Sequence, residues 1–154
     1  ENQQGINRML KAIEDVNRKY DSSIGALGAR WGLNSEESFR NALKAILEES
    51  FAVQVVNVNE YDDEGEVFGR PDQVELDILI KNGLLIICEI KSSMSKSDMY
   101  AFERKIRFYE KQHNRQATRR IAISPMVDDK AMAAAAQAGI EVYSYARDVK
   151  PVAG

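Results

Sequence analysis

Residues 74–91 read Val-Glu-Leu-Asp-Ile-Leu-Ile-Lys-Asn-Gly-Leu-Leu-Ile-Ile-Cys-Glu-Ile-Lys. Two nearly continuous runs of Leu, Ile and Val are separated by an Asn-Gly pair, which favours a tight turn between two strands. Asp77, Glu89 and Lys91 lie within or at the end of these runs. A charge in an apolar strand costs free energy unless it is paired, hydrogen-bonded or bound to a metal. The stretch therefore predicts a β-hairpin on which three charged residues form a hydrolytic site.

Length and composition are typical of one globular protein of ordinary size. The chain has 154 residues, of which 44% are hydrophobic and 29% charged. No apolar run reaches the roughly 18 residues of a membrane span, and residues 1–19 lack the apolar stretch of a signal peptide. The single cysteine, Cys88, cannot form an internal disulfide. We therefore expect a cytoplasmic protein that does not bind membranes.

Charge is distributed unevenly along the chain. The net charge is -3, which argues weakly against a nucleic-acid partner. Residues 31–90 contain thirteen acidic and four basic residues, whereas residues 91–120 contain nine basic and three acidic ones. Because acidic residues precede the candidate site and basic residues follow it, the net charge alone does not exclude nucleic acid.

The first thirty residues predict a helix with one apolar side. Its apolar residues are spaced three and four apart, with Ser23 as the one lapse: Ile6, Met9, Ile13, Val16, Tyr20 and Leu27. Such a seam is too apolar to remain in water, so residues 1–30 are interpreted as a coiled coil that forms a homodimer, ahead of a domain over residues 31–154. Alternatively, the helix folds back over its own domain, bent at Gly25, Gly28 and Gly32.

A second helix is predicted to begin after Asn34, which suits the N-cap, with Glu37 as the acid of a capping box. Its buried face is formed by Phe39, Leu43, Ile46 and Leu47. Glu36 lies on the same stripe as these residues, whereas Glu37 falls with Arg40 and Lys44 on the opposite side. We therefore expect Glu36 to point inward.

The remaining pattern predicts an α/β domain with a mixed sheet. Residues 73–81 and 84–92 are almost continuously apolar, which indicates strands covered on both faces. A strand, a helix and a further strand imply a parallel pair with a right-handed crossover. The other predicted elements are a valine-rich strand at 51–61, a helix at 97–114, a strand at 121–124, a helix at 128–138 and a strand at 140–145.

The element order, with Asp77 on the second strand and Glu89-x-Lys91 on the third, resembles the PD-(D/E)XK nuclease superfamily, or restriction-endonuclease-like fold. The resemblance covers about residues 31–146. A literal Pro-Asp pair ends at Asp72 but lies outside the strand, so Asp77 is the better match. The resemblance implies an αβββαβ core, with a mixed central sheet flanked by helices. It also implies a nuclease that uses Mg²⁺ or Mn²⁺, with DNA as the expected substrate.

The implied chemistry suits these residue types. A magnesium-like ion takes hard oxygen ligands, and Asp77, Glu89 and the main-chain carbonyl of Ile90 could supply three. Lys91 would orient the attacking water or stabilise developing negative charge. In superfamily members with an additional acid on the first helix, that acid reaches the site, and the matching residue here is Glu36. An acid that only complements the helix dipole is the alternative for Glu36.

Strand geometry adds a condition on the turn. A two-residue turn would pair Asp77 with Cys88, so that Asp77 and Glu89 would project from opposite faces of the sheet. A three-residue loop over 81–83 would instead pair Asp77 with Ile87 and bring both carboxylates to one face. Because the predicted metal site needs one face, we expect the three-residue loop.

The predicted helix at 97–114 and its start contribute basic residues next to the site. Four are predicted to bind nucleic acid: Lys96, Arg104, Arg107 and Lys111. A solvated helix surface is the alternative for these residues, and an ordinary ion pair is the alternative for Glu89 with Lys91. For the whole chain, the alternatives are a catalytically weak or inactive nuclease-fold scaffold that dimerises through its first helix, and a coiled-coil interaction protein.

Overall fold

The computed structural model describes residues 33–91, 93–124 and 126–144, together with Arg8 and Lys11. Arg8 and Lys11 are helical and exposed. The predicted coiled coil, the homodimer and the domain boundary at residue 30 lie outside the described residues and stay predictions. Within the described part of the chain, no helix is long and apolar enough to cross a membrane.

The predicted α/β fold with a mixed central sheet is confirmed. The described elements are α2 (Leu33–Phe51), β1 (Gln54–Asp62), β2 (Asp72–Lys81), β3 (Leu84–Ile90), α3 (Lys96–His113), β4 (Arg119–Ile123), α4 (Asp129–Ala138) and β5 (Glu141–Tyr143). The strands lie side by side in the order β1-β2-β3-β4-β5. Asn34 lies inside α2, so the prediction that it caps this helix is wrong.

Connection lengths explain why the sheet is mixed. β1, β2 and β3 pair antiparallel because a loop over 63–71 and a turn at 82–83 join them without a crossover helix. β3, β4 and β5 pair parallel because α3 and α4 cross between them. Ser95 and Asp98 form a capping box at the start of α3, and Asp128 caps α4. These caps set where each crossover helix begins, directly after the loop that leaves a strand.

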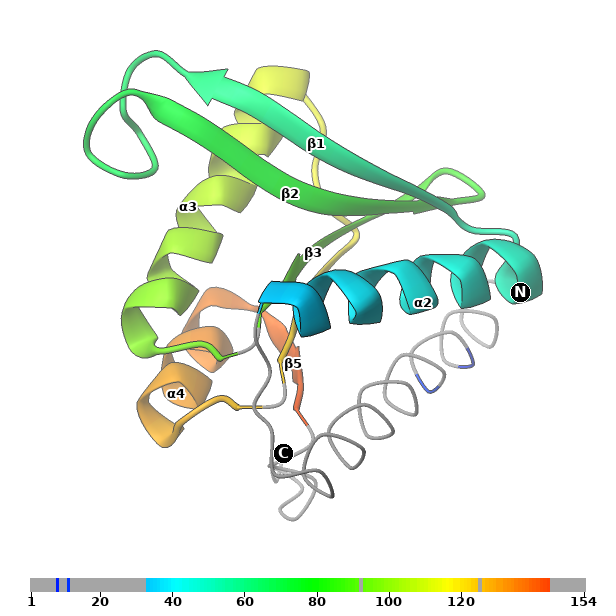
Figure 1. Ribbon diagram of the computed structural model, residues 1–154. Coiled ribbons are helices and arrows are strands. Elements are labelled where there is room, and N and C mark those ends of the chain that lie inside the picture. Colours follow the sequence, from blue (N-terminus) through cyan, green and yellow to red (C-terminus); the bar gives the residue numbers. More distant parts are fainter. Residues whose placement is uncertain (1–7, 9–10, 12–32, 92, 125, 145–154) are drawn as a thin grey trace.

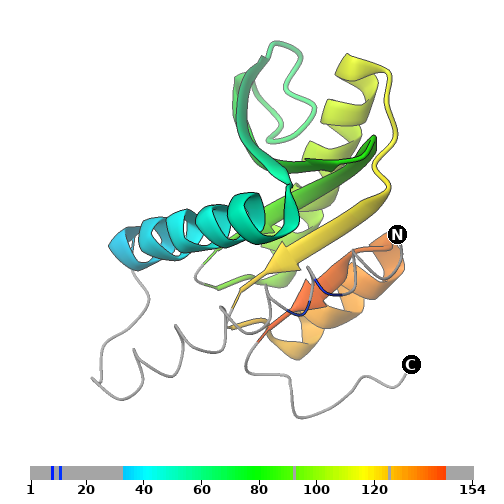
Figure 2. The same cartoon turned by 90° about the vertical axis from the view of Figure 1, so that its right-hand side faces the viewer.

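Both faces of the sheet are covered, as the continuous apolar strands predict. On one face, Leu43 and Leu47 of α2 pack against strand residues that include Leu79 and Cys88. On the other face, α3 and α4 cover a second apolar cluster whose largest fully buried side chain is Phe102. Figures 1 and 2 show α2 on one side of the sheet and α3 with α4 on the other.

The turn between β2 and β3 has two residues, so the predicted three-residue loop is wrong. Asn82 and Gly83 have φ angles of 51° and 82°, and Lys81 pairs with Leu84 across the turn. Asn-Gly favours this turn because both of its central residues need a positive φ. The apolar runs do not oppose it, because strands with two buried faces accept either register.

Candidate active site on the β2–β3 hairpin

Asp77 lies on the face of the sheet that α2 covers, and it is 6% exposed. Asn57 is its direct partner on β1 and donates from Nδ2 to Asp77 Oδ1 over 3.1 Å. Arg40 of α2 donates from Nε to Asp77 Oδ2 over 3.2 Å. Both carboxylate oxygens are therefore hydrogen-bonded, one to a neutral amide and one to a cation.

Arg40 has a second contact in the same place. Its Nη2 donates to the main-chain carbonyl oxygen of Ile90 over 3.1 Å. One guanidinium thus joins α2 to β2 and β3, and it touches two of the three groups predicted as metal ligands, the Asp77 carboxylate and the Ile90 carbonyl. The prediction that Arg40 lies on the outer side of α2 is wrong. Arg40 lies three residues before Leu43 and seven before Leu47, so it shares the inward face of the helix with these two leucines.

Glu89 lies on the opposite face of the hairpin, toward α3. Lys105 Nζ donates to its two carboxylate oxygens over 3.3 and 3.2 Å, and also lies 3.3 Å from the main-chain oxygen of Glu75. Burial raises the pKa of Glu89 above its ordinary value, although the charges of Lys105 and Lys91 act in the opposite direction. The lysine therefore offsets only part of the cost of burying this carboxylate.

The predicted convergence on one side of the sheet is wrong for Asp77 and Glu89. Asp77 pairs with Cys88, so alternation along β3 directs Glu89 to the other face. Lys91 follows directly after β3, where its N–H donates to the carbonyl oxygen of Ile123 over 3.1 Å, and its charge acts on Glu89. Each carboxylate has its own cation, supplied by a different helix.

The β2–β3 hairpin lies in a segment that matches a known protein family. Residues 72–141 match the family model described as PD-(D/E)XK nuclease superfamily. The hairpin thus lies in a segment that is similar to this superfamily. Residues 1–71 match a model described as protein of unknown function (DUF3782). No curated protein and no solved structure matches the chain significantly.

The candidate site contains residues from both family matches, which meet between residues 71 and 72. Asp77, Glu89 and Lys91 lie in the PD-(D/E)XK segment, but the partners of Asp77, Arg40 and Asn57, come from the preceding one. The preceding segment contributes α2 and β1, which share one sheet and one apolar core with the PD-(D/E)XK strands. The nuclease-superfamily hairpin is thus held by residues outside its own match.

The donor chemistry of this hairpin fits a divalent ion better than its arrangement does. PD-(D/E)XK nucleases generally use Mg²⁺ or Mn²⁺, and carboxylate and carbonyl oxygens suit these ions. The Asp77 carboxylate and the Ile90 carbonyl oxygen both contact Arg40, whereas the Glu89 carboxylate contacts Lys105. Among the described residues, no cluster of three or more His, Cys, Asp or Glu could hold a metal. Two of the three predicted ligands therefore contact the same cation, Arg40, and the third lies on the opposite face of the sheet.

The additional acid of the first helix stays a prediction. Glu36 belongs to α2, but its side chain lies outside the described part of the chain. Its backbone position is one helical turn before Arg40, whose side chain reaches the hairpin. Glu37 is exposed. The helix face turned toward Asp77 is therefore the face on which position 36 lies.

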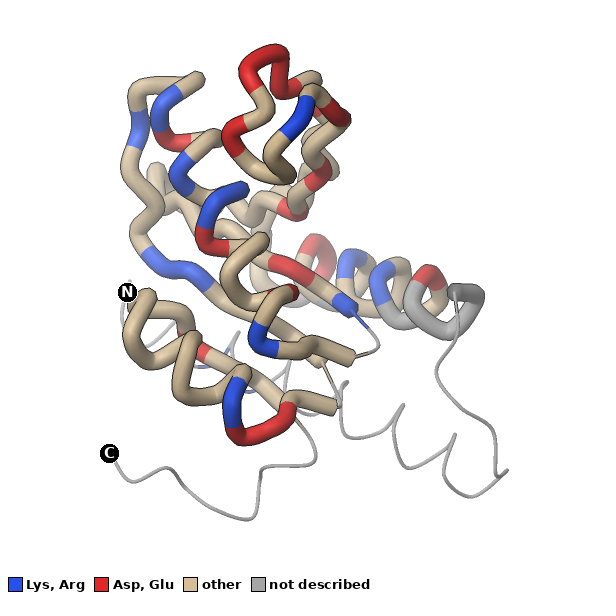
Figure 3. Tube along the Cα trace, turned by 90° about the vertical axis from the view of Figure 1, so that its left-hand side faces the viewer, with Lys and Arg blue, Asp and Glu red and all other residues tan. Residues whose placement is uncertain are grey.

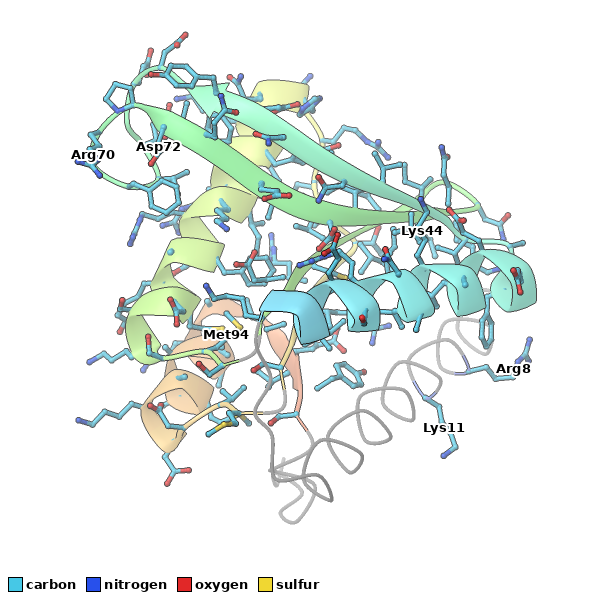
Figure 4. All side chains as sticks on the ribbon, viewed as in Figure 1. Arg8, Lys11, Lys44, Arg70, Asp72 and Met94 are labelled. Carbon is cyan, nitrogen blue, oxygen red and sulfur yellow. The ribbon has the colours of Figure 1, made fainter. Side chains whose placement is uncertain are left out.

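Asp72 is separated from this group of residues. It lies at the loop end of β2, near Arg70, whereas β2 pairs with β3 only from Asp77 onward (Figure 4). Asp72 is exposed and pairs in register with Asp62 of β1. The Pro71-Asp72 pair, which matches the letters PD of the superfamily name, is thus distant from Glu89 and Lys91. This distance favours Asp77 as the aspartate of the motif.

The four predicted nucleic-acid contacts already have partners within the protein. Arg104 donates to the Val67 carbonyl over 2.6 Å, Arg107 pairs with Glu103, Lys111 pairs with Glu66, and Lys96 lies 5.9 Å from the centre of the Tyr100 ring. Both acidic and basic residues lie along α3 (Figure 3). The exposed ion pairs of Arg107 and Lys111 are weak, so these two side chains can leave their carboxylates and bind a phosphate instead. Arg104 instead binds the loop between β1 and β2 through Val67.

Sequence reasoning did not identify the residues that hold the two carboxylates. Arg40 and Lys105 each occupy an inward helical position, three residues before Leu43 and three after Phe102. That spacing is the available signal, because a cation on an apolar stripe needs a buried acid as its partner. Asn57 offered a weaker signal, since an amide in a valine-rich strand is also a common edge residue.

Proposed function

We propose that this chain is a Mg²⁺- or Mn²⁺-dependent nuclease that hydrolyses phosphodiester bonds of DNA. The similarity of residues 72–141 to the PD-(D/E)XK superfamily supports nuclease activity in general. The single observation that carries the proposal further is the shared cation of Asp77 and the Ile90 carbonyl, since two hard oxygen atoms from adjacent strands are directed to one positive charge. An ion bound there would polarise a phosphate and activate a water.

The residues of the chain have separate roles in this proposal. The Asp77 carboxylate and the Ile90 carbonyl would hold the ion, while Asn57 keeps the carboxylate oriented through Oδ1. Lys91 has its backbone fixed against β4 and would stabilise negative charge on the phosphate. Glu89 lies on the α3 face with Lys105, so in the observed register it supplies no ligand to this ion.

Cleavage assays with matched carboxylate variants test this proposal. Duplex, branched and single-stranded DNA and RNA would each be incubated with Mg²⁺, with Mn²⁺ or with a chelator. We expect Asp77→Asn and Lys91→Ala to abolish cleavage, and the matched control Asp72→Asn, on the same strand, to retain it. Equal cleavage by the Asp77 and Asp72 variants would reject the site.

A further variant locates Glu89 relative to the working site. Loss of cleavage in Glu89→Gln, with the fold intact by circular dichroism, would mean that Glu89 reaches the ion in the working enzyme. Retained cleavage in Glu89→Gln, together with loss in Asp77→Asn, would restrict the site to the α2 face. The first result would contradict the observed register of the hairpin, and the second would agree with it.

A binding module with the nuclease fold is the second candidate. The observation that favours it is the pairing of both carboxylates with cations on opposite faces, which is also the arrangement of two structural ion pairs. Such a module would bind nucleic acid or a partner without turnover. Binding of DNA by the parent protein with no cleavage under any ion condition would select this candidate.

A further inference from the structure

The contacts of Arg40 differ from those of an ordinary ion pair. Its guanidinium reaches an acidic side chain and a main-chain carbonyl at once, over 3.2 Å to Asp77 and 3.1 Å to Ile90. These oxygens belong to different strands, β2 and β3, and the cation comes from a third element, α2. A positive charge between two hard oxygen atoms occupies the kind of environment that a divalent ion requires.

We propose that Arg40 is a built-in competitor of the divalent ion, a positioning residue that holds Asp77 and the Ile90 carbonyl together and must withdraw when the ion binds. This inference rests on the proposed function for the identity of the ion. An ion bound to Asp77 Oδ2 and the Ile90 carbonyl oxygen would take the place of the two Arg40 N–H groups, and the guanidinium and the ion would repel each other at this distance. Binding of the ion and contact with Arg40 therefore exclude one another.

The surroundings of Arg40 permit this exchange. Its side chain is 33% exposed, whereas that of Asp77 is 8% exposed, so the guanidinium can turn toward water while the carboxylate stays in place. Asn57 holds the other oxygen, Oδ1, and is neutral, so it does not repel an ion. By comparison, Lys105 on the other face is only 13% exposed and has less access to solvent.

Ion binding by the full chain tests the competition directly. Titration calorimetry with Mn²⁺ would compare the parent with Arg40→Met, whose side chain is long, uncharged and a poor ligand for this ion. We expect the dissociation constant to fall about tenfold in Arg40→Met, because the competing charge is gone. Lys44→Met, on the same helix and exposed, is the matched control and should bind like the parent. The double variant Arg40→Met with Asp77→Asn should lose the gain.

A folded Arg40→Met protein that binds Mn²⁺ no more tightly than the parent would overturn the proposal. A second measurement on the unaltered chain covers the case in which that variant does not fold. Mg²⁺ titration followed by nuclear magnetic resonance should shift the Arg40 Nε–H signal and leave the Arg107 Nε–H signal in place. An Arg40 signal that stays unchanged at saturating Mg²⁺ would equally overturn the proposal.

Failure of this inference can be distinguished from failure of the nuclease proposal. Metal-dependent cleavage by the parent, with Arg40→Met binding Mn²⁺ like the parent, would refute the competition and leave the nuclease. Tighter Mn²⁺ binding by Arg40→Met, without cleavage of any substrate by the parent, would support the competition and refute the nuclease.

Discussion

Arg40 and Lys105 each hold one carboxylate of the β2–β3 hairpin, on opposite faces of the sheet. Arg40 and Asp77 are 33% and 8% exposed, whereas Lys105 and Glu89 are 13% and 11% exposed. The carboxylates are thus similarly buried, and only the cations differ. A carboxylate can change from a side-chain cation to a metal ion when the cation can move into solvent. Because Arg40 is the more exposed of the two cations, the α2 face is the more accessible to an incoming ion. The α3 pair is more enclosed and better suited to hold the sheet and helix together.

The largest expected effect is the loss of the enclosed cation. Lys105→Met should lower the free energy of unfolding by about 3 kcal/mol, because it leaves Glu89 charged and buried without a partner. Arg40→Met should lower it by only about 1 kcal/mol, because Asp77 keeps Asn57 and gains access to water. Urea unfolding followed by circular dichroism measures both.

A double variant serves as the control for this comparison. Lys105→Met combined with Glu89→Gln removes both charges and should recover part of the lost stability. An Arg40 variant that is destabilised as much as the Lys105 variant would show that the two faces do not differ.

A smaller effect is expected at the turn that separates the two faces. Asn82 has a φ of 51° only because the turn has two residues, so Asn82→Ala should cost about 1 kcal/mol of stability. Asn82→Gly is the matched control and should cost much less, since glycine accepts a positive φ. Equal stabilities of the two variants in urea unfolding would favour the three-residue loop, in which Asp77 and Glu89 share a face.

The smallest expected effect is the pH dependence that Glu89 adds to stability. Its pKa in the folded state is raised from 4.5 by burial, so the folded protein binds this proton more tightly than the unfolded chain does. The stability that the proton provides is complete at low pH and is lost as the pH rises through the raised pKa. The unfolding free energy of Glu89→Gln should therefore increase relative to the parent over this window.

Metal-free urea titrations from below pH 4.5 to neutral pH would measure this difference. Glu103→Gln, on the same helix as Lys105, controls for the loss of one carboxylate. A difference that falls with rising pH would mean that Lys105 more than offsets the burial of Glu89, and the α3 pair would then be a net source of stability.

Much of the fold could be predicted from local patterns. The strands of the hairpin, the crossover helices and the mixed sheet follow from apolar periodicity and turn residues, because these signals act within short segments. The superfamily resemblance came from the same segments, since its motif places Asp77 and Glu89 on adjacent strands. Arg40 and Lys105 were not predicted as partners, because their pairing joins helices to strands 37 and 16 residues away in the chain.

The sequence by itself determined the elements, their order, and which residues carry charge into apolar strands. Only the tertiary structure decided which face each charge occupies. The apolar runs of β2 and β3 suit both faces equally, so they leave the register open, and the Asn82-Gly83 turn selects it. Helix packing then supplies a cation from each side, Arg40 to Asp77 and Lys105 to Glu89, because a buried carboxylate needs a partner on its own face.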